Sequence, residues 1–211
     1  MVTAIVPAGS APVYWTLQAA WMGGDLVGFS LSWIAVPAAA RGKLLDVLKL
    51  TPTGNFEEVP KAAASGINLP TGWYVVLRNR VEMTAGTSAD LARLSRSIGV
   101  IACFVEEHVM VSWARGWSAG TLAWSVCHDL QVGLRHLEAS GDLPPEYPAV
   151  RDRLLGKQDQ DPDGADYVFD VPVALAERLT GFRHDFTPPS REDRRFEVLD
   201  SVRGGWRRWF A

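Results

Sequence analysis

Residues 97–130 read SIGVIACFVEEHVMVSWARGWSAGTLAWSVCHDL, and this stretch decides the fold because it carries the strongest strand pattern in the chain. It holds both cysteines, two of the four histidines and three of the nine tryptophans. β-Branched and aromatic residues favour strands, whereas glycines and charged pairs favour the turns between them. The pattern predicts three consecutive antiparallel strands, at about 100–106, 108–114 and 121–127, with a tight turn near Glu106–Glu107 and a loop over Arg115–Gly120.

Three further segments show strand patterns before this stretch. Val13–Trp21 and Val27–Ala35 alternate apolar residues with small or polar ones, and a period of two is typical of strands. Gly23-Gly24-Asp25 between them favours a hairpin turn. Residues 73–80, WYVVLRNR, predict a third strand.

Helical patterns occupy most of the remaining chain. Apolar residues recur there every three or four positions, and capping residues, glycines or prolines stand at the ends. We expect helices over 38–50, 56–64 and 88–98, and, after the central stretch, over 129–141, 144–156, 170–179 and 192–202.

This order of elements, ββ-α-β-α-βββ and then helices, predicts an α+β fold. We expect an antiparallel sheet of about six strands with a C-terminal group of helices, and with Trp113 and Trp124 on its buried side. A seam near Leu143–Pro145 divides the chain into a sheet domain, 1–143, and a helical region packed on it, 144–211. The alternative is one single domain over 1–211.

Composition and charge exclude several classes of protein. The 211 residues carry a formal net charge of −3, whereas a nucleic-acid-binding surface needs a basic footprint. Two cysteines are too few for a disulfide framework, and the chain has neither a signal-peptide pattern nor an apolar run of about 18 residues. We expect a cytoplasmic protein with no membrane or nucleic-acid partner and, without a cofactor fingerprint or a P-loop, with no cofactor.

Cys127 and His108 are the first candidates for catalysis. If Ala114 lies opposite Thr121, antiparallel pairing places His108 opposite Cys127. A thiol beside an imidazole is the arrangement that produces a nucleophilic thiolate. The alternative is that both cysteines are small core residues and that His108 is a hydrogen-bonded strand residue.

Two neighbours of this pair complete the catalytic hypothesis. His128, next to the cysteine in sequence, is the second candidate base, and Asp129 or Glu106 is a candidate to orient an imidazole.

An acidic loop is the candidate metal site. Asp159, Asp161 and Asp163 are spaced as in the first half of a calcium loop, Gly164 follows as the turn residue, and Asp170 stands at the twelfth position. The sequence matches an EF-hand loop only over its first six positions, which are residues 159–164. The alternative is a solvated acidic loop.

Five further residues are candidates for binding a partner. Glu106 and Glu107 form an acidic turn that suits a basic partner. Arg183 is a candidate anion contact, and His184 faces the Cys127 region if the C-terminal helices fold over the sheet. The alternative for these two is a surface loop after a helix. Trp117 is a candidate interface anchor, because tryptophan is enriched at binding hot spots.

The pattern as a whole favours a protein-interaction module. Tryptophans are numerous, acidic loops are present, and no strong catalytic motif appears. Our specific hypothesis is a bacterial immunity protein that binds and neutralises a toxin partner. The alternative is a thiol-dependent hydrolase or transferase that uses Cys127 with a nearby histidine.

Overall fold

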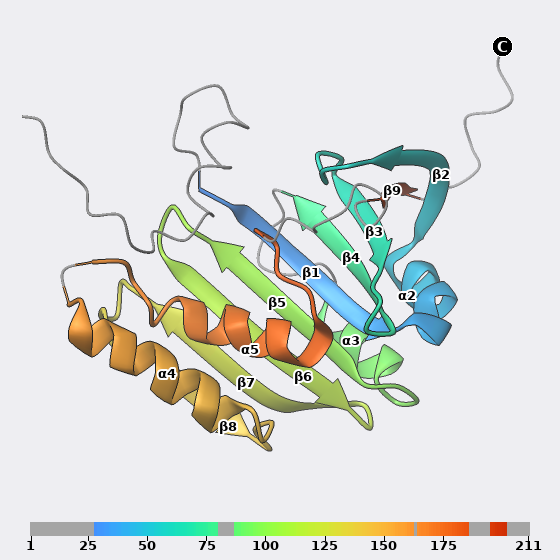
Figure 1. Ribbon diagram of the computed structural model, residues 1–211. Coiled ribbons are helices and arrows are strands. Elements are labelled where there is room, and N and C mark those ends of the chain that lie inside the picture. The colour runs from blue at the N-terminus through green and yellow to red at the C-terminus, as the bar shows by residue number, and fades with distance from the viewer. Residues whose placement is uncertain (1–27, 80–86, 163, 186–194, 202–211) are drawn as a thin grey trace, which may run out of the picture.

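The computed structural model describes residues 28–79, 87–162, 164–185 and 195–201, and in them one antiparallel sheet lies between two groups of helices (Figure 1). The predicted strand 13–21, the turn after it and Asp163 lie outside these residues. The elements in chain order are β1 (Ser30–Pro37), η1 (Ala38–Ala40), α2 (Arg41–Leu48), β2 (Leu50–Glu57), β3 (Ala64–Asn68), β4 (Trp73–Asn79), α3 (Ser88–Leu94), β5 (Val100–Glu106), β6 (Val111–Ser118), β7 (Thr121–Asp129), β8 (Glu138–Gly141), α4 (Tyr147–Gln160), α5 (Asp170–Thr180) and β9 (Phe196–Ser201).

The described strands form one sheet of nine, in the order β2-β9-β3-β4-β1-β5-β6-β7-β8. Strands β5 to β8 follow one another as a meander, whereas β1 lies between β4 and β5. Strand β9, from the far end of the chain, lies between β2 and β3. The region after residue 144 therefore supplies α4, α5 and a strand inside the same sheet.

Strand β1, at the centre of the sheet, is almost completely buried. Leu31 to Val36 are all buried, and their side chains alternate between two apolar clusters. Trp33 and Ala35 belong to the cluster under α4 and α5, and Ile34 and Val36 to the cluster under α2 and α3. A strand with two apolar faces needs helices on both sides of the sheet, which is the arrangement seen.

The α+β class, the antiparallel sheet and the helices on it are confirmed, but the number and order of the strands were wrong. Segment 56–64 contains the end of β2 and the start of β3 rather than a helix, 129–141 contains turns and β8, and 192–202 contains β9. Strands β2, β8 and β9 are short or exposed along much of their length, so each depends on a neighbouring strand rather than on its own apolar periodicity.

The predicted register of the central hairpin was also wrong. The β6–β7 turn is only Ala119 and Gly120, both with positive φ, as a two-residue type I′ turn requires. Strand β6 therefore continues to Ser118, and a β-bulge at Gly116/Trp117 adjusts the pairing with β7. Trp113, rather than His108, lies opposite Cys127.

This register divides the tryptophans between the two faces of the sheet. Trp113 and Trp117 belong to the cluster under α2 and α3, whereas Trp124 belongs to the cluster under α4 and α5. All three are buried, as expected, but not on a common side. No helix of the described residues is long and apolar enough to cross a membrane.

Replacement of Leu199 by alanine tests the position of β9. Leu199 is buried opposite Pro52 and Ala64, so Leu199→Ala should lower the free energy of unfolding by about 2–4 kcal/mol. Asp200→Ala is the matched control, because its side chain is exposed on the same strand. Urea unfolding followed by tryptophan fluorescence measures both. Equal, small effects would contradict the placement of β9 in the sheet.

Candidate functional site

Cys127 lies on the face of the sheet that points away from α4 and α5, and it is half-buried there. It lines an open cavity of about 520 Å³. Burial raises the pKa of the Cys127 thiol above its ordinary value, and the positive charge of Arg115 only partly offsets this effect. The thiol is therefore protonated near neutral pH. The residues lining the cavity are Arg115, Ser125, Cys127, Leu137, Glu138, Ala139 and Ser140.

His108 is not near this thiol, because it lies in the β5–β6 turn. Its Nδ1 is 2.6 Å from Oε1 of Glu106, and the other oxygen of Glu106 accepts a hydrogen bond from the Ser30 hydroxyl. Burial alone would raise the pKa of Glu106, but these hydrogen bonds lower it. Glu106 and His108 thus stabilise the turn where β1 begins and β5 ends.

His128 lies on the opposite face from Cys127 and has a fully buried side chain. Its Nδ1 is 2.7 Å from the carbonyl oxygen of His136, and its Nε2 is 3.0 Å from Oδ2 of Asp166. A carbonyl can only accept, so Nδ1 carries a hydrogen. The contact with Asp166 has the length of an ion pair but is poorly aligned for a hydrogen bond.

The surroundings of His128 favour the imidazolium form. A neutral ring with its hydrogen on Nδ1 would present the lone pair of Nε2 to a carboxylate, which is repulsive. Burial alone would lower the pKa of His128, but the contacts with Asp166 and the His136 carbonyl raise it. His128 therefore forms a buried ion pair and is not available as a catalytic base.

Asp166 and Asp129 have structural contacts as well. Oδ1 of Asp166 accepts the N–H groups of Val168 and Phe169, just before α5 begins. The pair with His128 therefore attaches this turn to β7. Asp129 accepts the N–H of Gln131 through its side chain and donates its own N–H to Nδ1 of His136, so it orders the turn after β7.

The described residues of the acidic loop, which do not include Asp163, do not assemble a ring of oxygen ligands. Asp159 belongs to α4 and pairs with Arg135, whereas Asp170 begins α5 and pairs with Arg183 at 2.8 Å. Asp161 lies at the end of α4, close to Gly164. Among the residues that the structure describes, no group of three His, Cys, Asp or Glu side chains is arranged to hold a metal ion.

Arg183 is held by carboxylates beside α5. Its Nη2 is 2.8 Å from Asp170, its Nε is 2.6 Å from Asp185, and its Nη1 is 3.8 Å from Glu177. Burial alone would lower the pKa of this guanidinium, but the carboxylates raise it. Arg183 is therefore occupied by contacts within the chain, and the three surrounding carboxylates leave the group negative.

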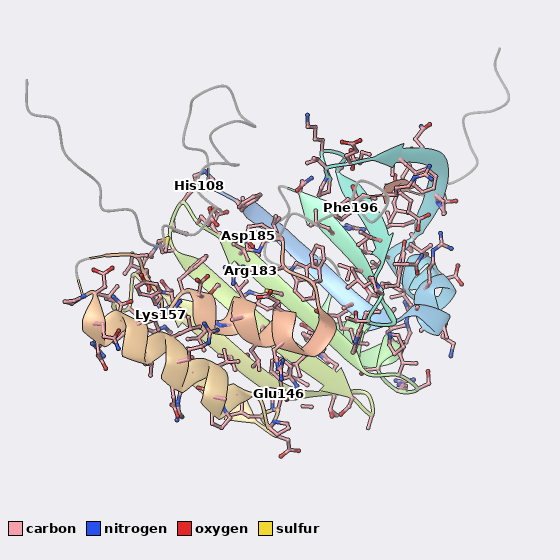
Figure 2. The ribbon with its side chains drawn as sticks, in the orientation of Figure 1. His108, Glu146, Lys157, Arg183, Asp185 and Phe196 are labelled. Carbon is pink, nitrogen blue, oxygen red and sulfur yellow. The ribbon has the colours of Figure 1, made fainter. Side chains whose placement is uncertain are left out.

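His184 meets Glu107 at the same end of the sheet. The side chain of His184 is 1% exposed, its ring packs edge-on against Phe29 at 4.9 Å, and its Nε2 is 3.7 Å from Oε1 of Glu107. The other oxygen of Glu107 accepts the N–H of Phe29. Segments 28–30, 106–108 and 183–185 thus lie together, and Figure 2 shows His108, Arg183 and Asp185 in this region.

Four of the five predicted binding residues are therefore brought together. Glu106, Glu107, Arg183 and His184 lie where β1 begins and β5 ends, although they come from distant parts of the chain. Trp117 is not among them, because it is buried in the core under α2 and α3.

An apolar surface that the sequence pattern did not indicate lies beside these residues. We define the end patch as Val109, Leu130, Val132 and Leu134, residues that are 43%, 38%, 68% and 40% exposed. The two loops that carry them are joined by a hydrogen bond from the N–H of Leu130 to the carbonyl of Met110. Gly133 could have indicated that this segment is not a helix, because it interrupts the apolar pattern of residues 129–141.

Comparisons with protein-family models, curated proteins and solved structures found no match to this chain. The function is therefore inferred from the geometry of the protein itself. That geometry separates Cys127 from both candidate histidines, and it gathers carboxylates and exposed apolar side chains at one end of the sheet.

The charge of His128 makes a testable contribution to stability. Because its folded pKa is raised, this contribution is complete below the unfolded pKa of about 6.5 and is lost as pH rises through the folded pKa. Asp166→Asn keeps an oxygen for the N–H groups of Val168 and Phe169 but removes the negative charge. It should lower the free energy of unfolding by about 3 kcal/mol below pH 6.5, and by less at higher pH.

Urea unfolding across a pH series measures this difference. Asp161→Asn is the matched control, because Asp161 is an exposed residue in the same connection between α4 and α5. A pH-independent effect of Asp166→Asn would contradict a charged His128.

Alkylation by iodoacetamide tests the state of Cys127. A thiol with a raised pKa should react more slowly than free cysteine at neutral pH, and its rate should still be rising at about pH 9. His108→Ala should leave the rate unchanged, since His108 contacts Glu106. Cys127→Ser identifies the reacting group, because Cys103 is fully buried. Fast alkylation that depends on His108 would restore the thiol-enzyme hypothesis.

Proposed function

We propose that this protein is a protein-interaction module that binds its partner through the end patch and the carboxylates beside it. Six large apolar side chains are strongly exposed among the described residues, and four of them form the end patch. Single exposed apolar residues are ordinary on protein surfaces, whereas a contiguous group is typical of an interaction site. This concentration in two adjoining loops is the observation that carries the proposal.

The charged groups near the end patch support a partner with a basic rim. Glu106 and Glu107 lie in the turn next to Val109, and Asp185 lies beside the start of β1 with Arg183. Charges around an apolar centre direct association and select partners by complementarity. The end patch therefore lies next to the acidic turn that the sequence predicted as a partner contact.

The side chains that a thiol enzyme would use are not arranged for catalysis. His128 is paired with Asp166 inside the protein, His108 is bound to Glu106, and the pKa of Cys127 is raised rather than lowered. A thiol enzyme needs a thiolate with a base beside it. The thiol-dependent alternative therefore has no specific geometric support, and binding is the function we propose.

Within this class, we propose a bacterial immunity protein that neutralises a toxin. An inhibitor of this kind needs a rigid scaffold and an exposed recognition surface, but no catalytic machinery. The sheet covered by helices supplies the scaffold, and the end patch supplies a surface that is exposed without its partner.

Co-expression with the product of the adjacent gene in its native host tests the proposal. We expect the two proteins to co-purify and the host cell to survive a toxic neighbour only when this protein is present. The double variant Val132→Asp/Leu134→Asp should weaken binding, measured by calorimetry, at least about tenfold, because charge is buried at the apolar centre of the interface.

Leu122→Asp is the matched control. Leu122 is 49% exposed in the β6–β7 hairpin, at the opposite end of the sheet from the end patch, so its replacement should leave binding unchanged. If the neighbouring product is harmless and does not bind, the immunity proposal fails. If binding occurs but both variants weaken it equally, the partner uses another surface.

A further inference from the structure

We propose that the cavity over β6, β7 and β8 is a second binding site, which takes a carboxylate group through Arg115. The site is separate from the end patch and does not depend on the proposed interaction function. It lies on the sheet face opposite α4 and α5, where Cys127 is half-buried. Its volume of about 520 Å³ falls in the range of small-ligand sites.

Two rows of paired residues cross the cavity. Arg115 lies opposite Ser125, which in turn lies opposite Ser140. In the second row, Cys127 lies between Trp113 and Glu138. Because residues at every second position of a strand share a face, these two rows present a cation, two hydroxyls and a thiol to the same side of the sheet.

Arg115 is the group that selects the ligand. Its guanidinium lies over the Trp113 ring, 4.4 Å from the ring centroid, and its Nε donates to the Ser125 hydroxyl at 3.4 Å. It forms no ion pair with a carboxylate of the described residues, unlike Arg183, which is held by Asp170 and Asp185. An arginine fixed by stacking presents its remaining N–H groups as a planar fork, which matches a carboxylate in two parallel hydrogen bonds.

The rest of the lining limits the ligand to a single negative charge. Glu138 is two strands away from Arg115, and its carboxylate is 3.3 Å from Nε2 of His136. A second anionic group on the ligand would be repelled by Glu138. The hydroxyls of Ser125 and Ser140 give the same cavity neutral polar groups. The lining therefore fits a monocarboxylate with a short neutral remainder.

Such a carboxylate has two sources, a free small molecule or an acidic side chain of a polypeptide. Butyrate is the probe for the first source, with butyramide as the neutral control, and an acetylated peptide with one glutamate is the probe for the second. Binding is measured on the full chain by tryptophan fluorescence, since Trp113 lies under Arg115, and by protection of Cys127 from iodoacetamide. Butyrate or the peptide should give saturable changes in both, and butyramide should give none.

Variants assign the binding to these residues. Arg115→Ala should weaken binding at least about tenfold, and Arg115→Lys should weaken it less, because the charge remains but the fork is lost. Glu138→Gln should strengthen binding by removing a competing negative charge. Circular dichroism and urea unfolding establish that each variant is folded.

The two probes also separate the sources. Tighter binding of butyrate indicates a small-molecule site, and tighter binding of the peptide indicates a polypeptide side chain. If neither probe binds, if butyramide binds as well as butyrate, or if folded Arg115→Ala binds unchanged, the proposal is overturned.

Discussion

The burial of β1 on both of its faces is the constraint on which the rest of the structure depends. Leu31 to Val36 are all removed from water, and the fully buried indole of Trp33 contributes a large apolar surface. Such a strand is stable only at the centre of a sheet with a covering layer on each side. Helices α2 and α3 form one layer and α5 forms the other, with α4 packed beside it (Figure 1).

Burial decreases with distance from the centre of the sheet, and both proposed sites lie where the helices cover the strands least. Strand β7 has one face covered by α5, whereas its other face is half-buried around Arg115. Every residue of β8 is exposed. The turns beyond the strands are covered by neither layer, so the apolar residues of the end patch remain in contact with water. The two proposed recognition surfaces therefore lie at the margins of the sheet, where residues change with little effect on the core.

One buried ion pair attaches the helical layer to the sheet, and a partly buried arginine joins the two ends of α5. The ion pair between His128 and Asp166 attaches the turn before α5 to β7, while Arg183 bonds to Asp170 at the start of the helix and to Asp185 after its end. Apolar contacts alone tolerate small displacements, whereas buried ion pairs lose stability when either partner moves. His128, which the sequence offered as a catalytic base, and Arg183, which it offered as an anion contact, therefore have structural contacts within the chain.

The sequence by itself determined the α+β class, the strands β4 and β5 and the helices α2, α3, α4 and α5, because each of these has its own periodicity or capping residues. Only the tertiary structure decided the place of β9 between β2 and β3, the opposition of Trp113 to Cys127, and the pairing of His128 with Asp166. These features join residues far apart in the chain or depend on the register set by a two-residue turn, and local patterns carry neither kind of information. The assembly of Glu107 with His184 and the exposure of the end patch follow from that same long-range packing.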